Sequence, residues 1–545
     1  MSKRSLAVLL LLSFCAPLGA AELPPLGSQA SKWAADLGHG AVATAEKRAG
    51  QWTFAIAGQP FAAGHAEVPA QQVIFEIGSI SKVFTGILLA HAVLDGKLGF
   101  DDTLAQRLPV KFGYAGTGAV TLKQLATHTS CLPRLPDNMM NPDGDDPYAQ
   151  YDDKALFEYL ASAKLERQPP CAPEYSNLGF GILGVVLERA YGKPWSALIQ
   201  EKITGPLGMV DTVQALSPAQ QSRFAEPWDG DKRAHSWTLK AFAGAGALRS
   251  TLADMSRFAD ALIAGPKGSL GKVWPLLAGD YVEMPSVGGK IGLALLHAKD
   301  DGEDSYSHDG GTGGYRSTLH VRPASGRAAV VLASNAAANP PAWLASWAAA
   351  ARPPVARSEV TLPSEVLDEY VGVYPIDKTA RFTVIRRGDG LVARLTGQPF
   401  LPIFASARDE LFYKVVDAQL SFHRNAAGKV EGLTLHQNGR DLPASRDSAP
   451  PPHVEFPNAA ALAEYAGEYD FGNYQPGATI TVRAVPGTLL VTLTGQPAFP
   501  VFAIGKDRFE YDVVVATLTF ERDQAGKVIA VVLHQNGRDM RAPKR

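Results

Sequence analysis

The chain has little net charge, few cysteines and no long apolar run after its first residues. Its 545 residues carry a formal net charge of -2, with 19% charged and 46% hydrophobic side chains. This balance excludes both a largely disordered chain and the basic face that nucleic acid binding requires. No later run of about 18 or more apolar residues occurs, so we expect no stable membrane span. The length predicts two or three domains.

The N-terminus has the pattern of an export signal. Lys3 and Arg4 precede an apolar run over 6–12, and small residues follow as far as Ala21. We therefore predict a signal peptide over 1–21 and a periplasmic or secreted mature protein. The stretch Leu12-Ser-Phe-Cys15 loosely resembles a lipoprotein signal. The bulky Phe14 beside the cut makes anchoring at Cys15 the less favoured interpretation.

Removing the signal leaves Cys131 and Cys171 of the three cysteines. In an oxidising compartment the two can pair, and two buried free thiols are the alternative that the sequence leaves open. Neither carries the signature of a catalytic cysteine.

The last third contains an internal duplication. Short alternating stretches broken by glycine turns lie between the repeated landmarks, a pattern typical of small antiparallel barrels. We predict two such all-β domains over 362–447 and 457–545, with linkers at Pro353-Pro354 and Pro450-Pro-Pro452 and tight turns at Asn438-Gly439 and Asn536-Gly537. The repeated landmarks are Tyr370-Val-Gly-Val-Tyr374 with Tyr465-Ala-Gly-Glu-Tyr469, Leu395-Thr-Gly-Gln-Pro399 with Leu493-Thr-Gly-Gln-Pro497, and His436-Gln-Asn-Gly-Arg-Asp441 with His534-Gln-Asn-Gly-Arg-Asp539.

The repeated histidines His436 and His534 invite a metal or catalytic interpretation. We find no second His, Cys or carboxylate at ligand spacing beside them, which favours a structural role. We predict no metal, and we expect the repeats to cap, shape or regulate access to the preceding domain.

Residues 22–355 mix helical and strand patterns. The periodicity predicts helices over 79–95, with Gly96 as a stop, and over 177–189, ending near Gly192. Strands are predicted over 315–321 and 328–334, joined by a turn at 323–326. Helices between early and late strands predict an α+β domain in which one antiparallel sheet shares both chain ends beside a helical subdomain.

Ser79-Ile-Ser-Lys82 places a hydroxyl and an amine three residues apart at the predicted start of a helix. Residues at this spacing share a helix face, so the two side chains can be neighbours. A serine hydroxyl is a weak nucleophile at neutral pH, and a nearby amine with a depressed pKa can accept its proton. The motif alone is weak evidence, because Ser269-Leu-Gly-Lys272 has the same spacing and no partner motifs after it.

Two further motifs follow Ser79 in order. Tyr175-Ser-Asn177 supplies a phenol that can exchange protons with a serine and an amide that can bind Lys82 and a carbonyl. His308-Asp-Gly310 leads into Gly311, where backbone N–H groups of a glycine-rich strand edge can stabilise an oxyanion. Considered singly, Tyr175, Asn177 and His308 are more ordinarily a core tyrosine, a capping asparagine and a turn histidine. Together, in this order after Ser79, these residues favour a catalytic site.

In this order the motifs resemble the serine β-lactamase and penicillin-binding protein superfamily, over roughly 35–340. Further matching stretches are Phe75-Glu-Ile-Gly-Ser79, Leu125-Ala-Thr-His-Thr-Ser130 and Leu248-Arg-Ser-Thr251. The tyrosine motif is similar to class C β-lactamases and to related D-aminopeptidases, DD-peptidases and esterases, and the paired barrels resemble those of D-aminopeptidases.

The resemblance implies a role for each residue and no cofactor. It implies that Ser79 is acylated, that Lys82 and Tyr175 move protons, and that Asn177 positions the substrate. His308, Gly310 and Gly311 would bind substrate, and the N–H groups of Ser79 and Gly311 would form the oxyanion hole. The implied partner is a β-lactam, a D-amino peptide or an ester.

Two departures bear on the substrate. His308 stands where class C enzymes have lysine, so the permanent cation facing a substrate carboxylate is lost or becomes pH-dependent. Cys131 stands where relatives usually have glycine. We therefore keep a D-aminopeptidase, DD-peptidase or carboxylesterase as alternatives to a β-lactamase, and a non-catalytic cell-wall or peptide receptor as a lesser one. No S-D-N element supports class A, and no G-x-S-x-G supports an α/β-hydrolase.

Overall fold

The structure is a computed structural model that describes residues 23–139, 146–279, 281–284, 289–300, 302–350, 357–376, 380–416, 418–437, 440–474, 477–485, 487–494, 498–535 and 537–545. The predicted signal peptide, Cys15, Pro353-Pro354, Asn438-Gly439 and Asn536 lie outside these residues. Among the described helices, none combines the length and apolar character that crossing a bilayer requires.

The first domain is built on one antiparallel sheet of eight strands, ordered β2-β1-β12-β11-β10-β9-β8-β7. The first strands therefore pair with the last, as the sequence predicts, and the α+β fold is confirmed. The strands are β1 (Ala41–Arg48), β2 (Gln51–Gly58), β7 (Val282–Met284), β8 (Gly289–Ile291), β9 (Leu296–Asp300), β10 (Glu303–Gly311), β11 (Arg316–Arg322) and β12 (Arg327–Ala333).

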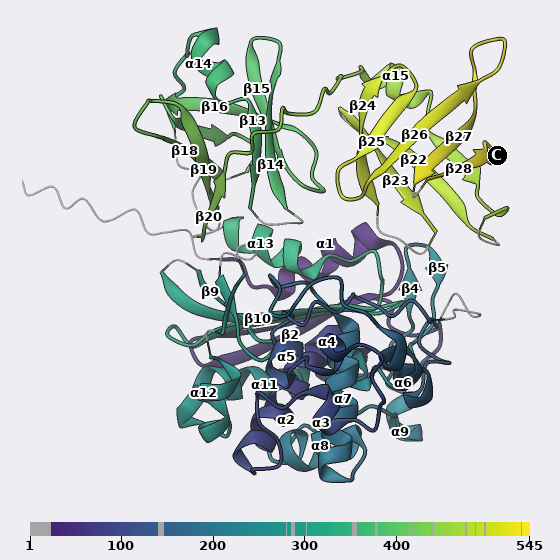
Figure 1. Cartoon of the computed structure of the whole chain (residues 1–545). Helices are drawn as coiled ribbons and strands as arrows, with labels where there is room; N and C mark the ends of the chain where they lie inside the picture. The colour runs from purple at the N-terminus through teal and green to yellow at the C-terminus, as the bar shows by residue number, and fades with distance from the viewer. Residues whose placement is uncertain are drawn as a thin grey trace, which may run out of the picture.

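Both faces of this sheet are covered. Successive side chains of β12 point to opposite faces and are apolar on both, so each face needs a covering layer. Val331 and Ala333 pack with α1 (Gly27–Leu37) and α13 (Pro340–Ala350), while Val330 and Leu332 face the main core. Trp33 of α1 stacks on Trp343 of α13 with ring centroids 5.0 Å apart. Figure 1 shows these two helices between the sheet and the barrels, and the helical subdomain on the other side of the sheet.

The helical subdomain surrounds α2 (Ser81–Leu94), a nearly fully buried helix. Its apolar residues on every side explain why neighbouring helices enclose it. The other helices are α3 (Leu104–Arg107), α4 (Ala115–Gly118), α5 (Leu122–Ala126), α6 (Asp153–Ser162), α7 (Asn177–Tyr191), α8 (Trp195–Ile199), α9 (Pro218–Gln221), α10 (Ala243–Gly246), α11 (Leu252–Ala264) and α12 (Trp274–Leu277). Short strand pairs are β3 (Ile74–Glu76) with β6 (Arg249–Thr251) and β4 (Trp228–Asp229) with β5 (Lys232–Arg233).

Each C-terminal repeat forms a nearly closed antiparallel sheet of eight strands. The ends meet where Asp447 N donates to Val373 O at 2.8 Å, and where Arg545 N donates to Glu468 O at 2.8 Å. The first repeat holds α14 (Ser364–Glu369), β13 (Gly372–Pro375), β14 (Arg381–Arg387), β15 (Gly390–Leu395), β16 (Leu401–Ala407), β17 (Glu410–Tyr413), β18 (Ala418–Arg424), β19 (Val430–Gln437) and β20 (Arg440–Ser445). The second holds α15 (Ala459–Ala463), β21 (Gly467–Asp470), β22 (Thr479–Val485), β23 (Thr488–Leu493), β24 (Phe499–Gly505), β25 (Arg508–Tyr511), β26 (Ala516–Arg522), β27 (Val528–Gln535) and β28 (Arg538–Pro543).

The repeated histidines brace neighbouring strands of each barrel. His436 contacts Asp441 through Nδ1 at 2.6 Å and Ser421 through Nε2 at 2.9 Å. His534 makes the matching contacts with Asp539 at 2.7 Å and Thr519 at 2.9 Å. A carboxylate thus does lie beside each imidazole, across the hairpin. No group of three or more His, Cys, Asp or Glu able to hold a metal occurs among the described residues.

Candidate active site

Ser79 lies in a 3₁₀ turn, Gly78–Ile80, directly before α2. The α-helix thus begins at Ser81 and not at the expected residue 79, and Gly78 at the start of the turn has φ of +49°. A Cβ on Gly78 would stand 2.6 Å from the backbone N of Gly311 on β10. Glycine at this position therefore lets the serine turn lie against the strand edge.

Lys82 is fully buried on the first turn of α2. Its Nζ lies 2.9 Å from Ser79 Oγ, 2.9 Å from Asn177 Oδ1 and 2.7 Å from the carbonyl oxygen of Ala245. Burial lowers the pKa of Lys82 well below its usual range, and the charge of Arg134 lowers it further. This environment favours the neutral amine, which can accept a proton.

The ring of Tyr175 lies beside the amine of Lys82, with its centroid 4.8 Å from Nζ. Burial raises the pKa of Tyr175 to about 12, although a hydrogen bond with Ser79 and the charge of Arg134 both act to lower it. The side chain is therefore a phenol at neutral pH. His128 packs against it with ring centroids 4.6 Å apart.

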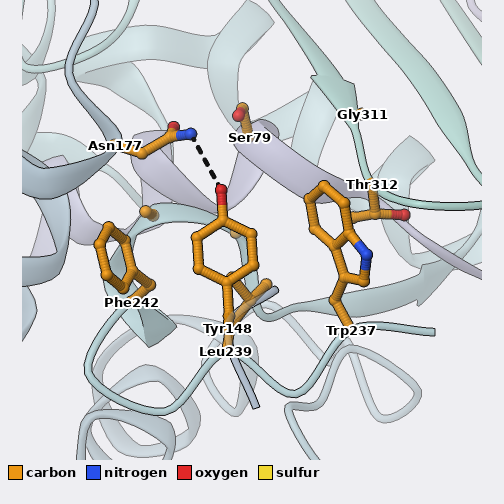
Figure 2. A pocket seen from close by; sticks show the side chains of 10 residues that line it. Ser79, Tyr148, Asn177, Trp237, Leu239, Phe242, Gly311 and Thr312 are labelled. Atoms are coloured by element: carbon orange, nitrogen blue, oxygen red, sulfur yellow. Dashed lines mark hydrogen bonds between the residues drawn. The ribbon is translucent and has the colours of Figure 1, made fainter. Parts of the chain in front are cut away.

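Asn177 begins α7, where Ser176 caps the helix by accepting from Gly179 N. The backbone N of Asn177 donates to Arg134 O at 3.1 Å, which ties the helix start to the loop before it. Its Nδ2 donates to Tyr148 Oη at 3.5 Å, the interaction dashed in Figure 2. The amide thus has its oxygen on Lys82 and its nitrogen toward the cavity.

Strand β10 carries His308, Gly310 and Gly311 to this region. A Cβ on Gly310 would stand 2.0 Å from Ile77 O, so glycine is required for this strand to meet the serine turn. His308 is 5% exposed, and its Nδ1 lies 2.6 Å from Asp309 O. Burial first, and then the proximity of the Lys82 amine, lower the pKa of His308 to about 4. His308 is therefore uncharged at neutral pH.

A cavity of about 20 Å³ lies beside Ser79. Of the residues predicted from sequence, Ser79, Asn177 and Gly311 line it, whereas Lys82, Tyr175, His308 and Gly310 do not. In Figure 2 the rings of Phe242, Tyr148 and Trp237 lie along the side opposite Ser79 and Gly311. The full lining is Ser79, Tyr148, Asn177, Trp237, Leu239, Phe242, Ala245, Gly246, Gly311 and Thr312.

Glu76 and Arg249, which the sequence interpretation did not assign to the site, hold one wall. Glu76 Oε1 accepts from Arg249 Nη2 at 3.0 Å and from the backbone N of Trp237 at 3.2 Å. The two charged residues lie in Phe75-Glu-Ile-Gly-Ser79 and Leu248-Arg-Ser-Thr251. The sequence marks these stretches only as further matches to the β-lactamase and penicillin-binding protein superfamily. Glu76 and Arg249 lie opposite each other in the pairing of β3 with β6, so the two stretches meet in the fold.

Cys131 and Cys171 form a disulfide, with Cα atoms 5.4 Å apart. The loop before Cys131 also bonds to the segment that leads to Tyr175: Cys171 N donates to Thr129 O at 2.9 Å and Glu174 N to His128 O at 2.8 Å. The disulfide therefore closes a loop that positions Tyr175. By contrast Ser269 and Lys272, the second match to the serine-lysine spacing, are both exposed.

Residues 35–351, more than half of the chain, match the Beta-lactamase family. The chain belongs to the beta-lactamase family. Residues 356–446, the first C-terminal repeat, match a domain of unknown function named DUF3471. Members of the beta-lactamase family are serine hydrolases that act on small-molecule or peptide substrates.

Three known proteins illustrate what this chain is similar to. D-alanyl-D-alanine-carboxypeptidase/endopeptidase AmpH of Escherichia coli (strain K12) is 35% identical over 199 residues, which cover 35% of this chain and 49% of AmpH. The chain thus spans about half the length of that relative. Penicillin-binding protein 4* of Bacillus subtilis (strain 168) is 26% identical over 70% of this chain and 91% of its own. A solved class C beta lactamase has a TM-score of 0.50 at 18% identity, covering 57% of this chain and 92% of its own, and shares the fold.

Proposed function

We propose that this protein is a serine hydrolase of class C type, which opens the amide of a β-lactam through an ester on Ser79. The observation that carries the proposal is the buried Lys82 amine, whose Nζ lies 2.9 Å from Ser79 Oγ and 2.9 Å from Asn177 Oδ1. Relatives named beta-lactamase, among them that of Providencia stuartii at 27% identity, support the choice of substrate.

The contacts of Lys82 suit a general base. A neutral amine has two N–H groups and one lone pair. When the N–H groups donate to Asn177 Oδ1 and to the carbonyl oxygen of Ala245, the lone pair faces the hydroxyl of Ser79. Lys82 then takes the Oγ proton as Oγ attacks the substrate carbonyl carbon and the carbonyl electrons move to its oxygen.

Tyr175 suits the acid that completes acylation. Its pKa of about 12 keeps the phenol protonated at neutral pH. As the tetrahedral intermediate collapses, the carbon–nitrogen bond breaks and the leaving nitrogen takes the phenol proton, which the protonated Lys82 replaces. The N–H groups of Ser79 and Gly311, brought together by the glycine contacts described above, hold the oxyanion.

Water then cleaves the ester. The cavity of about 20 Å³ beside Ser79 has room for about one water molecule, for which about 10–15 Å³ suffices. Lys82, neutral again after acylation, accepts the water proton as the water oxygen attacks the ester carbonyl. The carbon–Oγ bond then breaks, and Ser79 Oγ takes that proton back from Lys82. Each proton transfer in this cycle has Ser79, Lys82 or Tyr175 as donor or acceptor, so no separate glutamate is needed.

A second candidate is a peptidase acting on D-amino peptides, or an esterase, with the same chemistry. Two observations favour this candidate. His308 is uncharged at neutral pH and cannot replace the lysine cation that class C enzymes have at this position. Three aromatic rings also line the cavity beside Ser79 and leave little space there. A small acyl group such as that of alanine suits this space better than a bulky one. The same Ser79 ester would form in either case.

One substrate panel tests the proposal. The mature protein is incubated with a chromogenic cephalosporin, a D-alanyl anilide and a short-chain nitrophenyl ester, each beside a Ser79→Ala variant. We expect cephalosporin turnover that the variant loses, and intact mass spectrometry should show the acyl adduct on Ser79.

The matched control is Ser269→Ala, at the exposed serine with the same motif spacing, and it should keep full activity. If only the anilide or the ester turns over, the β-lactamase proposal fails and the second candidate stands. If Ser79→Ala keeps full activity, the serine mechanism fails. If nothing turns over but a labelled β-lactam or peptide binds, the protein is the non-catalytic receptor.

We also propose that the mature protein works in the periplasm or outside the cell. The N-terminal pattern over 1–21 and the Cys131–Cys171 disulfide support this location, because disulfides persist in oxidising compartments. Cell fractionation of the full-length chain tests it, and a protein that stays in the cytoplasm with its first 21 residues attached would contradict it.

A further inference from the structure

The tyrosine motif is held in place at its central residue. Ser176 separates Tyr175 from Asn177, and it is 1% exposed. Its Oγ donates to the carbonyl oxygen of Pro133 at 2.7 Å. Its backbone N donates to Nδ1 of His128 at 3.1 Å. The position of Ser176 therefore depends on a side chain that the proposed reaction does not use.

His128 lies in the loop between α5 and the disulfide, and it is 2% exposed. Its ring packs on the rings of Tyr175 and Phe180, with centroids 4.6 Å and 5.1 Å away. Its backbone oxygen accepts from Glu174 N at 2.8 Å. His128 thus contacts three consecutive residues of the chain, Glu174, Tyr175 and Ser176.

The hydrogen bond to Ser176 determines where the imidazole carries its proton. A backbone N–H can only donate, so Nδ1 offers its lone pair and the proton of the neutral ring is on Nε2. Burial lowers the pKa of His128 well below its usual range. Three neighbouring groups act in the same direction, and they are Lys82, His308 and Arg134. The ring therefore stays neutral at neutral pH and keeps Nδ1 as an acceptor.

Packing alone does not account for a histidine at this position. The Nε2 atom of His128 is buried and has no hydrogen-bond partner among the described residues. A buried donor without a partner destabilises the folded chain. An apolar side chain would fill the same space without this cost, so what distinguishes histidine here is the acceptor at Nδ1.

We propose that His128 is a positioning residue for the reaction at Ser79: it accepts from Ser176 N, packs on the ring of Tyr175 and so holds the phenol beside Lys82. The inference rests on the proposed function, in which Tyr175 gives its proton to the leaving nitrogen. His128 does not line the cavity beside Ser79, so it acts through Tyr175 and does not bind the substrate.

Two substitutions isolate the acceptor. The backbone of His128 has φ of +60°, a conformation that asparagine and glycine both tolerate. His128→Asn and His128→Gly both remove the ring, and only asparagine keeps an acceptor, its Oδ1, where Nδ1 stands. We expect kcat of the glycine variant to lie about 10- to 100-fold below that of the asparagine variant, as a small misplacement of a reacting group produces. KM should differ little, because the cavity lining is unchanged.

A second comparison decides the question if the glycine variant does not fold. In His128→Gln the amide reaches the place of Nε2, so its oxygen misses Ser176 N and kcat should fall well below that of His128→Asn. His423→Leu, at an exposed histidine on β18 of the first barrel, is the control and should keep full turnover. Urea unfolding shows whether each variant is folded under the assay conditions.

A double-variant cycle tests whether His128 acts through the phenol of Tyr175. The Tyr175→Phe variant has no phenol to position, so adding His128→Gly to it should lower kcat by less than about threefold further. A residue that only stabilised the fold would lower kcat by the same factor in both backgrounds. The cycle therefore separates a positioning role from a structural one.

Steady-state kinetics on the preferred substrate of the panel give these values. The inference is overturned when the asparagine variant has no higher kcat than the glycine and glutamine variants, or when His128→Gly lowers kcat equally with and without the phenol. If the parent chain turns over a substrate and all His128 variants match it, only the inference fails. If the parent chain turns over nothing, the proposed function fails and the inference fails with it.

Discussion

Buried Glu76, directly before the turn that carries Ser79, forms an ion pair with the mostly buried Arg249, with Oε1 3.0 Å from Nη2. Burial raises the pKa of Glu76 to about 7 although Arg249 acts to lower it. The folded protein therefore holds a proton on Glu76 more tightly than the unfolded chain, whose carboxyl has its ordinary pKa of 4.5. This group contributes most stability below pH 4.5, and the contribution is lost as pH rises to about 7.

Glu76→Gln should remove that dependence. We expect the free energy of unfolding of the parent chain to fall by about 3 kcal/mol more than that of the variant between pH 4.5 and 7.5, at about 1.4 kcal/mol per pKa unit. Urea unfolding at several pH values measures it. Glu166→Gln, at an exposed glutamate, should leave the slope unchanged. Parallel curves for Glu76→Gln and the parent would contradict the prediction.

The rate of turnover should fall at acid pH and should not fall at alkaline pH. Protonated Lys82 cannot accept the Ser79 proton, so kcat/KM should rise with pH through the lowered pKa of Lys82 and then level off. Tyr175, with a pKa of about 12, should cause no decline below about pH 10. A rate profile from pH 4 to 10 measures both limbs. A decline between pH 7 and 9 would show that another acid governs the rate.

Tyr175→Phe should lower kcat about 10²- to 10⁴-fold, the usual contribution of a positioned acid or base. KM should change little, because the ring and its packing remain. Steady-state kinetics on the preferred substrate of the panel measure the split. Tyr159→Phe on α6, a buried tyrosine outside the cavity lining, is the control and should keep normal kinetics. Equal kcat in the two variants would exclude Tyr175 as the proton donor.

Replacing Cys131 and Cys171 by serine should cost about 4 kcal/mol of unfolding free energy, from the entropy of a loop with a sequence separation of 40. We also expect kcat to fall, since the disulfide closes the loop that positions Tyr175. Chemical denaturation and kinetics measure the two effects. Reductant should affect the parent chain and leave the double variant unchanged; the same sensitivity in both would contradict the assignment.

Trp237→Ala should widen the cavity beside Ser79. The ratio of kcat/KM for a bulky acyl ester to that for an acetyl ester should rise at least tenfold, because the removed ring lies opposite the nucleophile. A pair of nitrophenyl esters measures it. Trp343→Ala, on α13, is the control. An unchanged ratio would mean that the substrate does not pass Trp237.

The sequence predicts well those parts of the site that are adjacent in the chain or follow a strong local pattern. Ser79 and Lys82 are three residues apart, and the helix 177–189 is found as α7 with Gly192 in the left-handed conformation after it. The pairing of early and late strands also follows from the order of the patterns.

The rest of the site depends on long-range packing. Tyr148 and Trp237 reach the cavity from segments with no distinctive pattern, and only the folded chain brings their rings within 5.0 Å of each other. His308 reads as a titratable cation in the sequence. Its burial in the fold removes the charge, and burial is not visible in a four-residue motif.

The pairing of β1 with β12 determines the order in which the domains can fold during synthesis. Val42 lies opposite Ala333, so the central sheet closes only after almost all of the first domain has left the ribosome. The barrels instead join neighbouring strands by short connections and can form locally as they emerge. A chain cut short before residue 327 would therefore leave β1 paired with β2 alone and without β12, and its unpaired strand edge would promote aggregation.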